Sequence, residues 1–266
     1  MFKDQMTMLI LSCDLFSDLW EGHFKLLEQN WPDRGMRTIL VTDKPTQRRF
    51  PGVEVFSAGA DKEWSERLGL ALQQVDTEFV FLTLDDYFLI RPVSNGQIGG
   101  DLAMMDREGL DYLRLFLRPM AKASARMREY GKVYRIDTNE RYSVNLYAGI
   151  WRKKFLTQTV REPKNAWRFE VCLPRIAREV GASCAMSNNR EFEILDVVRK
   201  GKLLHRAVRY FRSHDVYHGD RPVISWWTEF KLGVRTWGVR VMPRRVTDAA
   251  RNFMIKRGHH YYSQEG

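Results

Sequence analysis

Several classes of protein are excluded by what this sequence lacks. It contains no run of about 18 apolar residues, so no membrane-spanning helix is predicted. It has three cysteines, Cys13, Cys172 and Cys184, which are scattered and show neither C-x-x-C nor His spacing. We therefore expect a reduced, cytoplasmic protein without structural zinc.

Two glycine-rich phosphate-binding signatures are also missing. Ser12-Cys13-Asp14 follows the first predicted strand, where a dinucleotide-binding domain or a glycine-rich methyltransferase would carry G-x-G-x-x-G. The pattern G-x-x-x-x-G-K-[ST] occurs nowhere, which argues against a P-loop NTPase. A nucleotide site in this chain would have to bind phosphate without either of these glycine-rich loops.

Acidic residues are scarce in the last quarter of the chain. From Arg199 to Gly266 there are 15 Lys and Arg but 5 Asp and Glu, whereas residues 1–198 hold 28 of each. The chain is thus a neutral body followed by a strongly basic segment. Such asymmetry indicates a polyanionic partner, either a membrane surface or a nucleic acid.

The first part of the chain alternates predicted strands and helices. The apolar spacing of Trp20, Phe24, Leu27 and Trp31 predicts one helix, with Ser17 or Asp18 as its N-cap. A second predicted helix is capped by Asp61 and buries Trp64 and Leu68. The predicted strands cover residues 6–12, 37–43, 53–56 and 79–84. This alternation predicts an α/β fold with a largely parallel sheet flanked by crossover helices.

Beyond residue 91 the pattern is less regular, as in an α+β arrangement. Further strands are predicted at 112–117, 132–136, 142–151 and 193–198, and further helices at 153–162, 167–180 and 203–211. Trp167 is expected in the core with Trp20 and Trp64. A boundary is predicted near residues 214–222, which divides the chain into a domain of residues 1–213 and an extension of residues 214–266.

The extension carries a Trp-rich apolar stripe with basic neighbours. Its members recur at three- and four-residue spacings: Trp226, Trp227, Phe230, Val234, Trp237 and Val241. Lys231, Arg235 and Arg240 lie off the stripe. This composition is typical of a helix that lies in a membrane interface. The alternative is that the stripe packs against the preceding domain.

The most informative motif is Asp85-Asp86, which directly follows the apolar run Phe79–Leu84. Ionised carboxylates are costly to bury unless they are paired, hydrogen-bonded or bound to a metal. Open α/β sheets place their ligands at the carboxyl ends of the strands. The pair therefore predicts a site for Mg²⁺ or Mn²⁺ that holds a diphosphate. It could instead only cap the following turn.

Four segments resemble one enzyme family. Asp85-Asp86-Tyr87-Phe88 looks like the D-x-D-type motif of GT-A glycosyltransferases, the nucleotide-diphospho-sugar transferase superfamily. Residues 145–151 (NLYAGIW) look like the strand at the sugar and acceptor site. Residues 165–170 (NAWRFE) are similar to an N-P-W-x-F-E helix start, and Gly201-Lys202 to a G-K-W motif. In particular, the chain resembles small bacterial enzymes of capsule and O-antigen synthesis.

The resemblance implies a role for each candidate residue. Asp86 would bind the metal, and Asp85 would share this work or hold the donor ribose or sugar. Glu170 would be the general base of an inverting transfer, although it could also be a first-turn helix acid. The remaining donor-binding candidates are the nucleotide loop Ser12, Cys13 and Asp14, the base-facing Asp43, and the phosphate-binding Arg67 and Lys202.

The implied function is metal-dependent glycosyl transfer. The resemblance implies a GT-A (Rossmann-like) fold, Mn²⁺ or Mg²⁺, a nucleotide-sugar donor with a UDP-sugar favoured, and a lipid-linked glycan acceptor in bacterial surface polysaccharide synthesis. Such an enzyme would work in the cytoplasm at the inner membrane face, and no nucleic acid would be its partner. The rival hypothesis is a nucleic-acid-binding protein or metal-dependent nuclease that uses Asp85, Asp86 and Glu170 with the basic tail. A third is a catalytically inactive scaffold.

Overall fold

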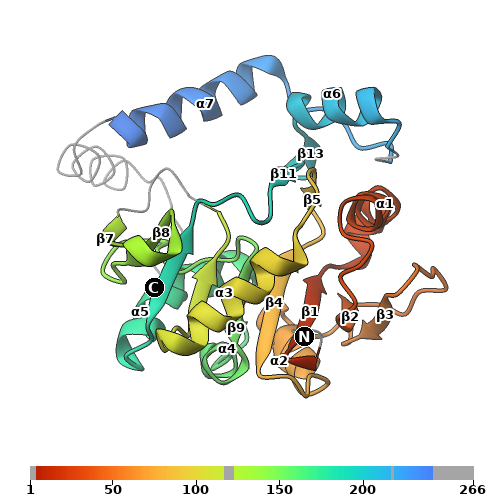
Figure 1. Cartoon of the computed structure of the whole chain (residues 1–266). Helices are drawn as coiled ribbons and strands as arrows, with labels where there is room; N and C mark the ends of the chain where they lie inside the picture. Colours follow the sequence, from red (N-terminus) through yellow and green to blue (C-terminus); the bar gives the residue numbers. More distant parts are fainter. Residues whose placement is uncertain (1–3, 117–122, 217–218, 242–266) are drawn as a thin grey trace.

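A large mixed sheet forms the centre of the molecule (Figure 1). The computed structural model describes residues 4–116, 123–216 and 219–241. Within these residues nine strands pair in the order β3-β2-β1-β4-β9-β6-β10-β8-β7. Their bounds are β1 Met6–Leu11, β2 Thr38–Thr42, β3 Glu54–Ser57, β4 Phe79–Leu84, β6 Tyr112–Arg114, β7 Ala123–Met127, β8 Val133–Ile136, β9 Gly149–Arg152 and β10 Cys184–Ser187.

The four strands that come first in the chain, β1 to β4, are all parallel to one another. β1 pairs in parallel with both β2 and β4, and β2 pairs in parallel with β3. Leu11 lies opposite Val41 on one side and Leu84 on the other. The segments that follow β1, β2 and β4 therefore emerge level with each other at one edge. This confirms the predicted α/β sheet and brings three candidate segments together.

Helices cover both faces of the sheet. One face packs on α1 (Trp20–Asn30) and α3 (Asn95–Arg107), and the other on α2 (Trp64–Leu72), α4 (Lys153–Thr159) and α5 (Ala166–Glu179). Within β1, Met8 and Ile10 join the first core, while Leu9 and Leu11 join the second. Successive strand residues point to opposite faces, so a fully apolar strand serves both cores.

Both predicted N-caps are wrong. The N-cap of α1 is Leu19, because a 3-10 helix, η2 (Asp14–Leu19), precedes it and takes up Ser17 and Asp18. The N-cap of α2 is Glu63 rather than Asp61. Glu63 and Glu66 form a reciprocal capping box, which satisfies two backbone donors that Asp61 lies too early to reach.

Two further expectations are corrected, and one helix was not predicted. The strand predicted at 142–151 is limited to β9, because the Asn145 side chain accepts the Tyr147 amide at 3.1 Å and turns the chain before it. α3 was not predicted, since its glycines lower helix propensity. The low helix propensity is offset by the burial of Ile98 and Leu102 and by the N-cap Ser94. Trp167 is 64% exposed on α5 and is not a core residue.

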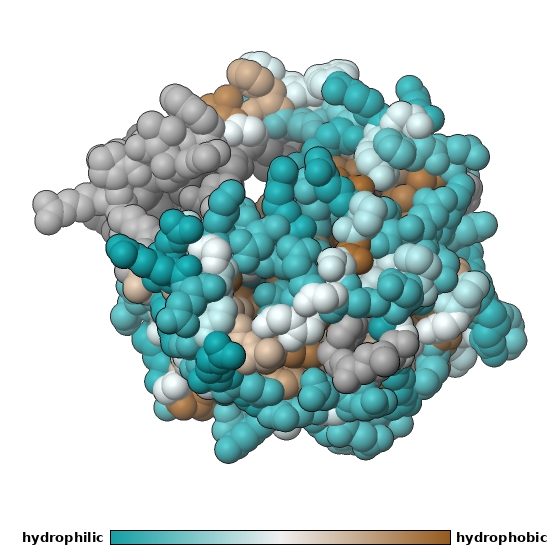
Figure 2. All heavy atoms as spheres, in the orientation of Figure 1, coloured by the Kyte–Doolittle hydropathy of each residue, from teal (hydrophilic) through white to brown (hydrophobic). Residues whose placement is uncertain are grey.

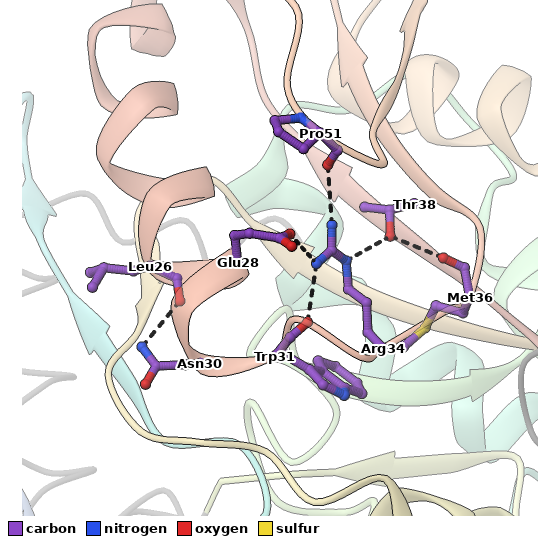
Figure 3. Close-up of polar contacts among 8 residues, drawn as sticks. All are labelled: Leu26, Glu28, Asn30, Trp31, Arg34, Met36, Thr38 and Pro51. Atoms are coloured by element: carbon purple, nitrogen blue, oxygen red, sulfur yellow. Dashed lines mark hydrogen bonds and ion pairs between the residues drawn. The ribbon is translucent and has the colours of Figure 1, made fainter.

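A buried arginine fixes the connection between α1 and β2 (Figure 3). The Arg34 guanidinium pairs with Glu28 at 2.8 Å and donates to the Trp31 carbonyl at 3.1 Å. It also reaches the Thr38 hydroxyl and the Pro51 carbonyl, each at 3.4 Å. Arg34 thereby ties the end of α1 to β2 and to the loop that leads into β3.

A smaller layer extends from the carboxyl end of β4. β5 (Tyr87–Leu89) pairs antiparallel with β11 (Ile194–Asp196), and β12 (Val198–Arg199) forms a hairpin with β13 (Lys202–Leu203). The helices α6 (His205–His214) and α7 (Trp226–Val241) follow and lie at the same end of the molecule (Figure 1). α6, Phe88 of β5 and Ile224 share a third apolar cluster, so residues of the predicted extension pack on the preceding body.

The helix predicted for the Trp-rich stripe is confirmed by α7. The side chains of Trp237 and Val241 lie outside the described residues, as does the basic segment 242–266. None of the helices in the described part of the chain combines the length and the apolar character needed to cross a membrane.

Candidate functional site

Ser12 stands at the centre of the polar contacts at the carboxyl edge of the sheet. It directly follows β1, and its hydroxyl donates to Asp85 Oδ2 in a short hydrogen bond. Trp20 Nε1 donates to the same hydroxyl at 2.7 Å. The Arg67 guanidinium, from α2, donates to the Ser12 carbonyl at 3.3 Å. One residue after β1 is thus tied to α1, α2 and the end of β4.

The neighbouring loop residues complete this cluster. The Asp14 amide donates to Asp43 Oδ1 at 2.6 Å, which joins the segments that follow β1 and β2. Burial, followed by the charges of Asp85 and Asp43, raises the pKa of the Cys13 thiol. Arg67 Nε is buried and has no hydrogen-bond partner among the described residues. The structure thus brings six of the donor-binding candidates together: Ser12, Cys13, Asp14, Asp43, Arg67 and Asp85.

Asp85 and Asp86 face different surroundings. Asp85 is 5% exposed, and burial raises its pKa to about 7, against the opposing effect of its hydrogen bonds to Ser12 and Trp20. Asp86 Oδ1 is buried and accepts no hydrogen bond from any described residue. Burial, reinforced by the charges of Asp85 and Asp196, raises the pKa of Asp86 well above its usual range.

The surroundings of Asp86 come from the small layer. Val197 donates its amide to the Asp86 carbonyl at 3.0 Å, so the end of β11 is held beside the turn. There Asp196, itself 7% exposed, pairs with Arg199 at 2.5 Å. The arrangement concentrates carboxylates, and the charge of Arg199 lowers the pKa of Asp86 against their effect. Arg206 also lies near Asp196, at 3.9 Å. Neither Asp196 nor Arg199 carried a local sequence signal, because their nearness to Asp86 results from the β5–β11 pairing.

The carboxylates after β4 suit a divalent cation that takes its other ligands from the phosphates of a bound molecule. Among the described residues, no group of three or more His, Cys, Asp and Glu is arranged to enclose a metal. The orphaned oxygen of Asp86 is nevertheless an available hard ligand in a carboxylate-rich setting. Mg²⁺ and Mn²⁺ sites commonly use one or two carboxylates and take the rest of their oxygens from phosphate and water.

Glu170 lies in α5, close to an aromatic stack. Its Oε1 accepts the Leu146 amide at 3.3 Å. Tyr87 and Tyr147 stack with ring centroids 5.3 Å apart, and Phe116 stacks on Tyr147 at 5.4 Å. Burial raises the pKa of Tyr87, and the charges of both Asp86 and Glu170 contribute. The charges of both carboxylates thus act on Tyr87, a neighbour that sequence reasoning missed.

Lys202 is not among the residues brought together. It is exposed on β13, opposite Arg199 in the hairpin, and none of the described contacts joins it to Asp85 or Asp86.

Arg221 contacts the loop after β1, a role that the sequence did not predict. It makes two hydrogen bonds to Asp18, at 2.7 and 2.8 Å, and another to the Leu15 carbonyl, and its charge lowers the pKa of Asp85.

No protein-family model matches the sequence, and no curated protein matches it. Solved structures do match. A mannosyltransferase, PcManGT from Pyrobaculum calidifontis in complex with GDP-Man and Mn²⁺, superposes with a TM-score of 0.50 at 14% identity, over 82% of this chain and 66% of that one. TarS from S. aureus (residues 1–349) in complex with UDP-GlcNAc gives 0.49 at 15% identity, over 75% and 60%.

A synthetase of CMP-2-keto-3-deoxy-manno-octonic acid in complex with CTP also matches, with a TM-score of 0.49 at 14% identity, over 80% of this chain and 100% of that one. The chain spans 36% of the longer TarS structure that it matches. At such identities the likeness concerns the fold. The parallel β3-β2-β1-β4 half and the superposition agree: this chain has a GT-A-like fold.

Proposed function

We propose that the protein is a glycosyltransferase that moves a sugar from a nucleotide-diphosphate donor to a hydroxyl group of a glycan acceptor. One observation carries this proposal. In a GT-A-like fold, two carboxylates follow the central strand β4, and Asp86 has a buried oxygen without a hydrogen-bond partner among the described residues. A mannosyltransferase of similar fold binds GDP-Man and Mn²⁺. The donor here is a nucleotide sugar, and we favour a UDP-sugar.

The donor would occupy the edge formed by the ends of β1, β2 and β4. Ser12, Cys13 and Asp14 line this edge, and Asp43 stands at its β2 side, where the base would lie. Arg67 Nε is an unused donor close to the Ser12 carbonyl and suits a phosphate oxygen. Lys202 would reach the diphosphate only if the β12–β13 hairpin moved toward it.

Asp86 would hold Mn²⁺ or Mg²⁺, with Asp85 as a neighbouring carboxylate. The bound ion supplies Lewis-acid stabilisation of the charge that develops on the diphosphate. Asp85 orients Ser12 through their short hydrogen bond and keeps the nucleotide loop against β4.

Glu170 is proposed as the general base. The acceptor oxygen forms a bond to the anomeric carbon and loses its proton to the Glu170 carboxylate. The bond between the anomeric carbon and the diphosphate oxygen breaks, and that oxygen keeps the electron pair. This single displacement inverts the anomeric centre. The Leu146 amide fixes the orientation of Glu170.

The acceptor proposed for this enzyme is a lipid-linked glycan of bacterial surface polysaccharide synthesis. That step takes place on the inner face of the plasma membrane. The proposal assigns transfer to residues 1–213 and membrane proximity to residues 214–266. It rests on the resemblance noted from sequence together with the basic charge of the extension.

Asp86→Ala tests the donor site. We expect wild type to be stabilised by Mn²⁺ with its cognate nucleotide sugar, by roughly 2.7 kcal/mol at a hundred times Kd, and Asp86→Ala to lose this shift and turnover. Asp76→Ala, which removes an exposed carboxylate, is the matched control. Glu170→Gln should keep the thermal shift and lose roughly 10²-fold or more in turnover. Full turnover of folded Asp86→Ala would refute the proposal.

A further inference from the structure

α7 exposes a contiguous apolar face. Trp226, Trp227, Phe230 and Val234 are 68%, 65%, 61% and 50% exposed, respectively. With about 100° of rotation per residue, these four positions fall within an arc of about 100° on the helix. Scattered exposed hydrophobic residues are common on soluble proteins, but three aromatic side chains on one helix face mark an interaction site.

The start of α7 is held firmly on α6. The Trp226 ring stacks on the His205 ring with centroids 3.6 Å apart and planes 9° apart. Glu229 Oε2 accepts the backbone amide of His205 at 3.2 Å and so binds a free donor at the start of α6. These contacts involve Glu229 and one side of the Trp226 ring. They leave most of the apolar arc, Trp226 included, exposed to solvent.

Exposed basic residues lie on α7 and on the elements that precede it, α6 and the β12–β13 hairpin. Lys231 lies over the Trp227 ring at 5.1 Å from its centroid. Arg209 and Arg212 are exposed on α6, and Lys200 and Lys202 are exposed on the β12–β13 hairpin. Figure 2 shows apolar residues, in brown, at the top of the molecule over the start of α7, with hydrophilic residues, in teal, over α6.

We propose that this face of α7, with the basic residues of α6 and the hairpin, docks the protein on a bilayer that contains anionic lipid. Trp and Phe on one side of a basic helix are suited to the boundary between headgroups and acyl chains. The exposed Lys and Arg are attracted to the negative surface potential. α6, α7 and β5, which follows the carboxyl end of β4, lie at the same end of the molecule, so docking would bring the candidate site close to the lipid (Figure 1). The inference does not depend on the proposed transfer, because binding is measured without turnover.

The test is co-sedimentation of the full chain with vesicles of phosphatidylcholine alone or mixed with phosphatidylglycerol. We expect binding to the anionic vesicles and little to the neutral ones. Trp227→Ala/Phe230→Ala should weaken the partition coefficient roughly tenfold or more, because two large aromatic surfaces no longer leave water. Arg209→Gln/Arg212→Gln should lower it by roughly 25-fold, and added salt should do the same.

Trp167→Ala is the matched control, since Trp167 is 64% exposed on α5, away from this face. It should bind as wild type does. The proposal fails if the anionic vesicles do not bind the wild-type chain or if the α7 double variant binds equally well. It also fails if sedimentation velocity shows a dimer that the α7 variant abolishes, because a second copy would then cover the face.

Discussion

Asp85 makes the stability of the ligand-free protein depend on pH in a defined direction. Burial raises its pKa from 3.8 to about 7. Between these two values the folded protein keeps a proton that the unfolded chain releases, so the free energy of unfolding falls as the pH rises. At 1.36 kcal/mol per pH unit the loss amounts to about 4 kcal/mol. It begins near pH 4 and is complete above about pH 7.

Asp85→Asn should remove this dependence. An amide has nearly the shape of a protonated carboxyl group and can still bond the Ser12 hydroxyl. We expect the variant and the wild type to unfold at similar temperatures near pH 4. Above pH 7 the variant should be the more stable, by roughly 8 °C if each kcal/mol moves the Tm of a chain of this size by about 2 °C.

Thermal unfolding in buffers without divalent cations, at several values between pH 4 and pH 8.5, measures the difference between the two curves. Changes at distant titrating groups cancel in that difference, whereas Asp86 also contributes to it, because the charge of Asp85 raises the pKa of Asp86. Asp76→Asn serves as the control, because its carboxylate is exposed in the folded state. Parallel curves for wild type and Asp85→Asn would show that Asp85 keeps its charge at little cost, and the reasoning from burial would be wrong.

Three other substitutions test separate parts of the structure. Arg221→Gln should lower the free energy of unfolding by about 1–3 kcal/mol in urea, because it leaves Asp18 without its two hydrogen bonds; an unchanged midpoint would contradict this. Gly149→Ala should cost about 1–3 kcal/mol, since its Cβ would lie 2.9 Å from the Leu113 carbonyl oxygen; a wild-type Tm would refute this packing. Asp101→Asn should raise the Tm several times more at pH 9 than at pH 5, as burial raises the pKa of Asp101 from 3.8 to about 8. Equal effects at both pH values would exclude a contribution from its ionisation.

Much of the architecture could be read from the sequence. The apolar runs at 6–12, 37–43 and 79–84 lie in strands of the sheet, because residues buried on both faces must be apolar throughout. The helix caps could not be read in this way. Ser17, Asp18 and Asp61 are suitable N-cap residues in isolation, yet η2 and the Glu63–Glu66 capping box occupy those turns.

The residues of the candidate site could likewise be predicted only in part. The sequence placed Ser12, Asp43 and Asp85 at strand ends, and a parallel sheet brings such ends to one edge. It gave no sign of Arg221, which reaches Asp18 across 203 positions of the chain. Nor did it separate Lys202 from the other candidates, because the β12–β13 pairing turns that residue to an exposed position.

By itself the sequence determined the parallel α/β sheet, the two carboxylates at the end of its central strand and the basic, aromatic end of the chain. These are local patterns of polarity and spacing. Only the tertiary structure decided that Asp85 is hydrogen-bonded to Ser12, while one oxygen of Asp86 has no hydrogen-bond partner in the described part of the chain. The tertiary structure also decided that the charge of Arg221 lowers the pKa of Asp85. Burial and charge pairing depend on segments that meet only in the folded chain, and they determine which carboxylate is available to a cation.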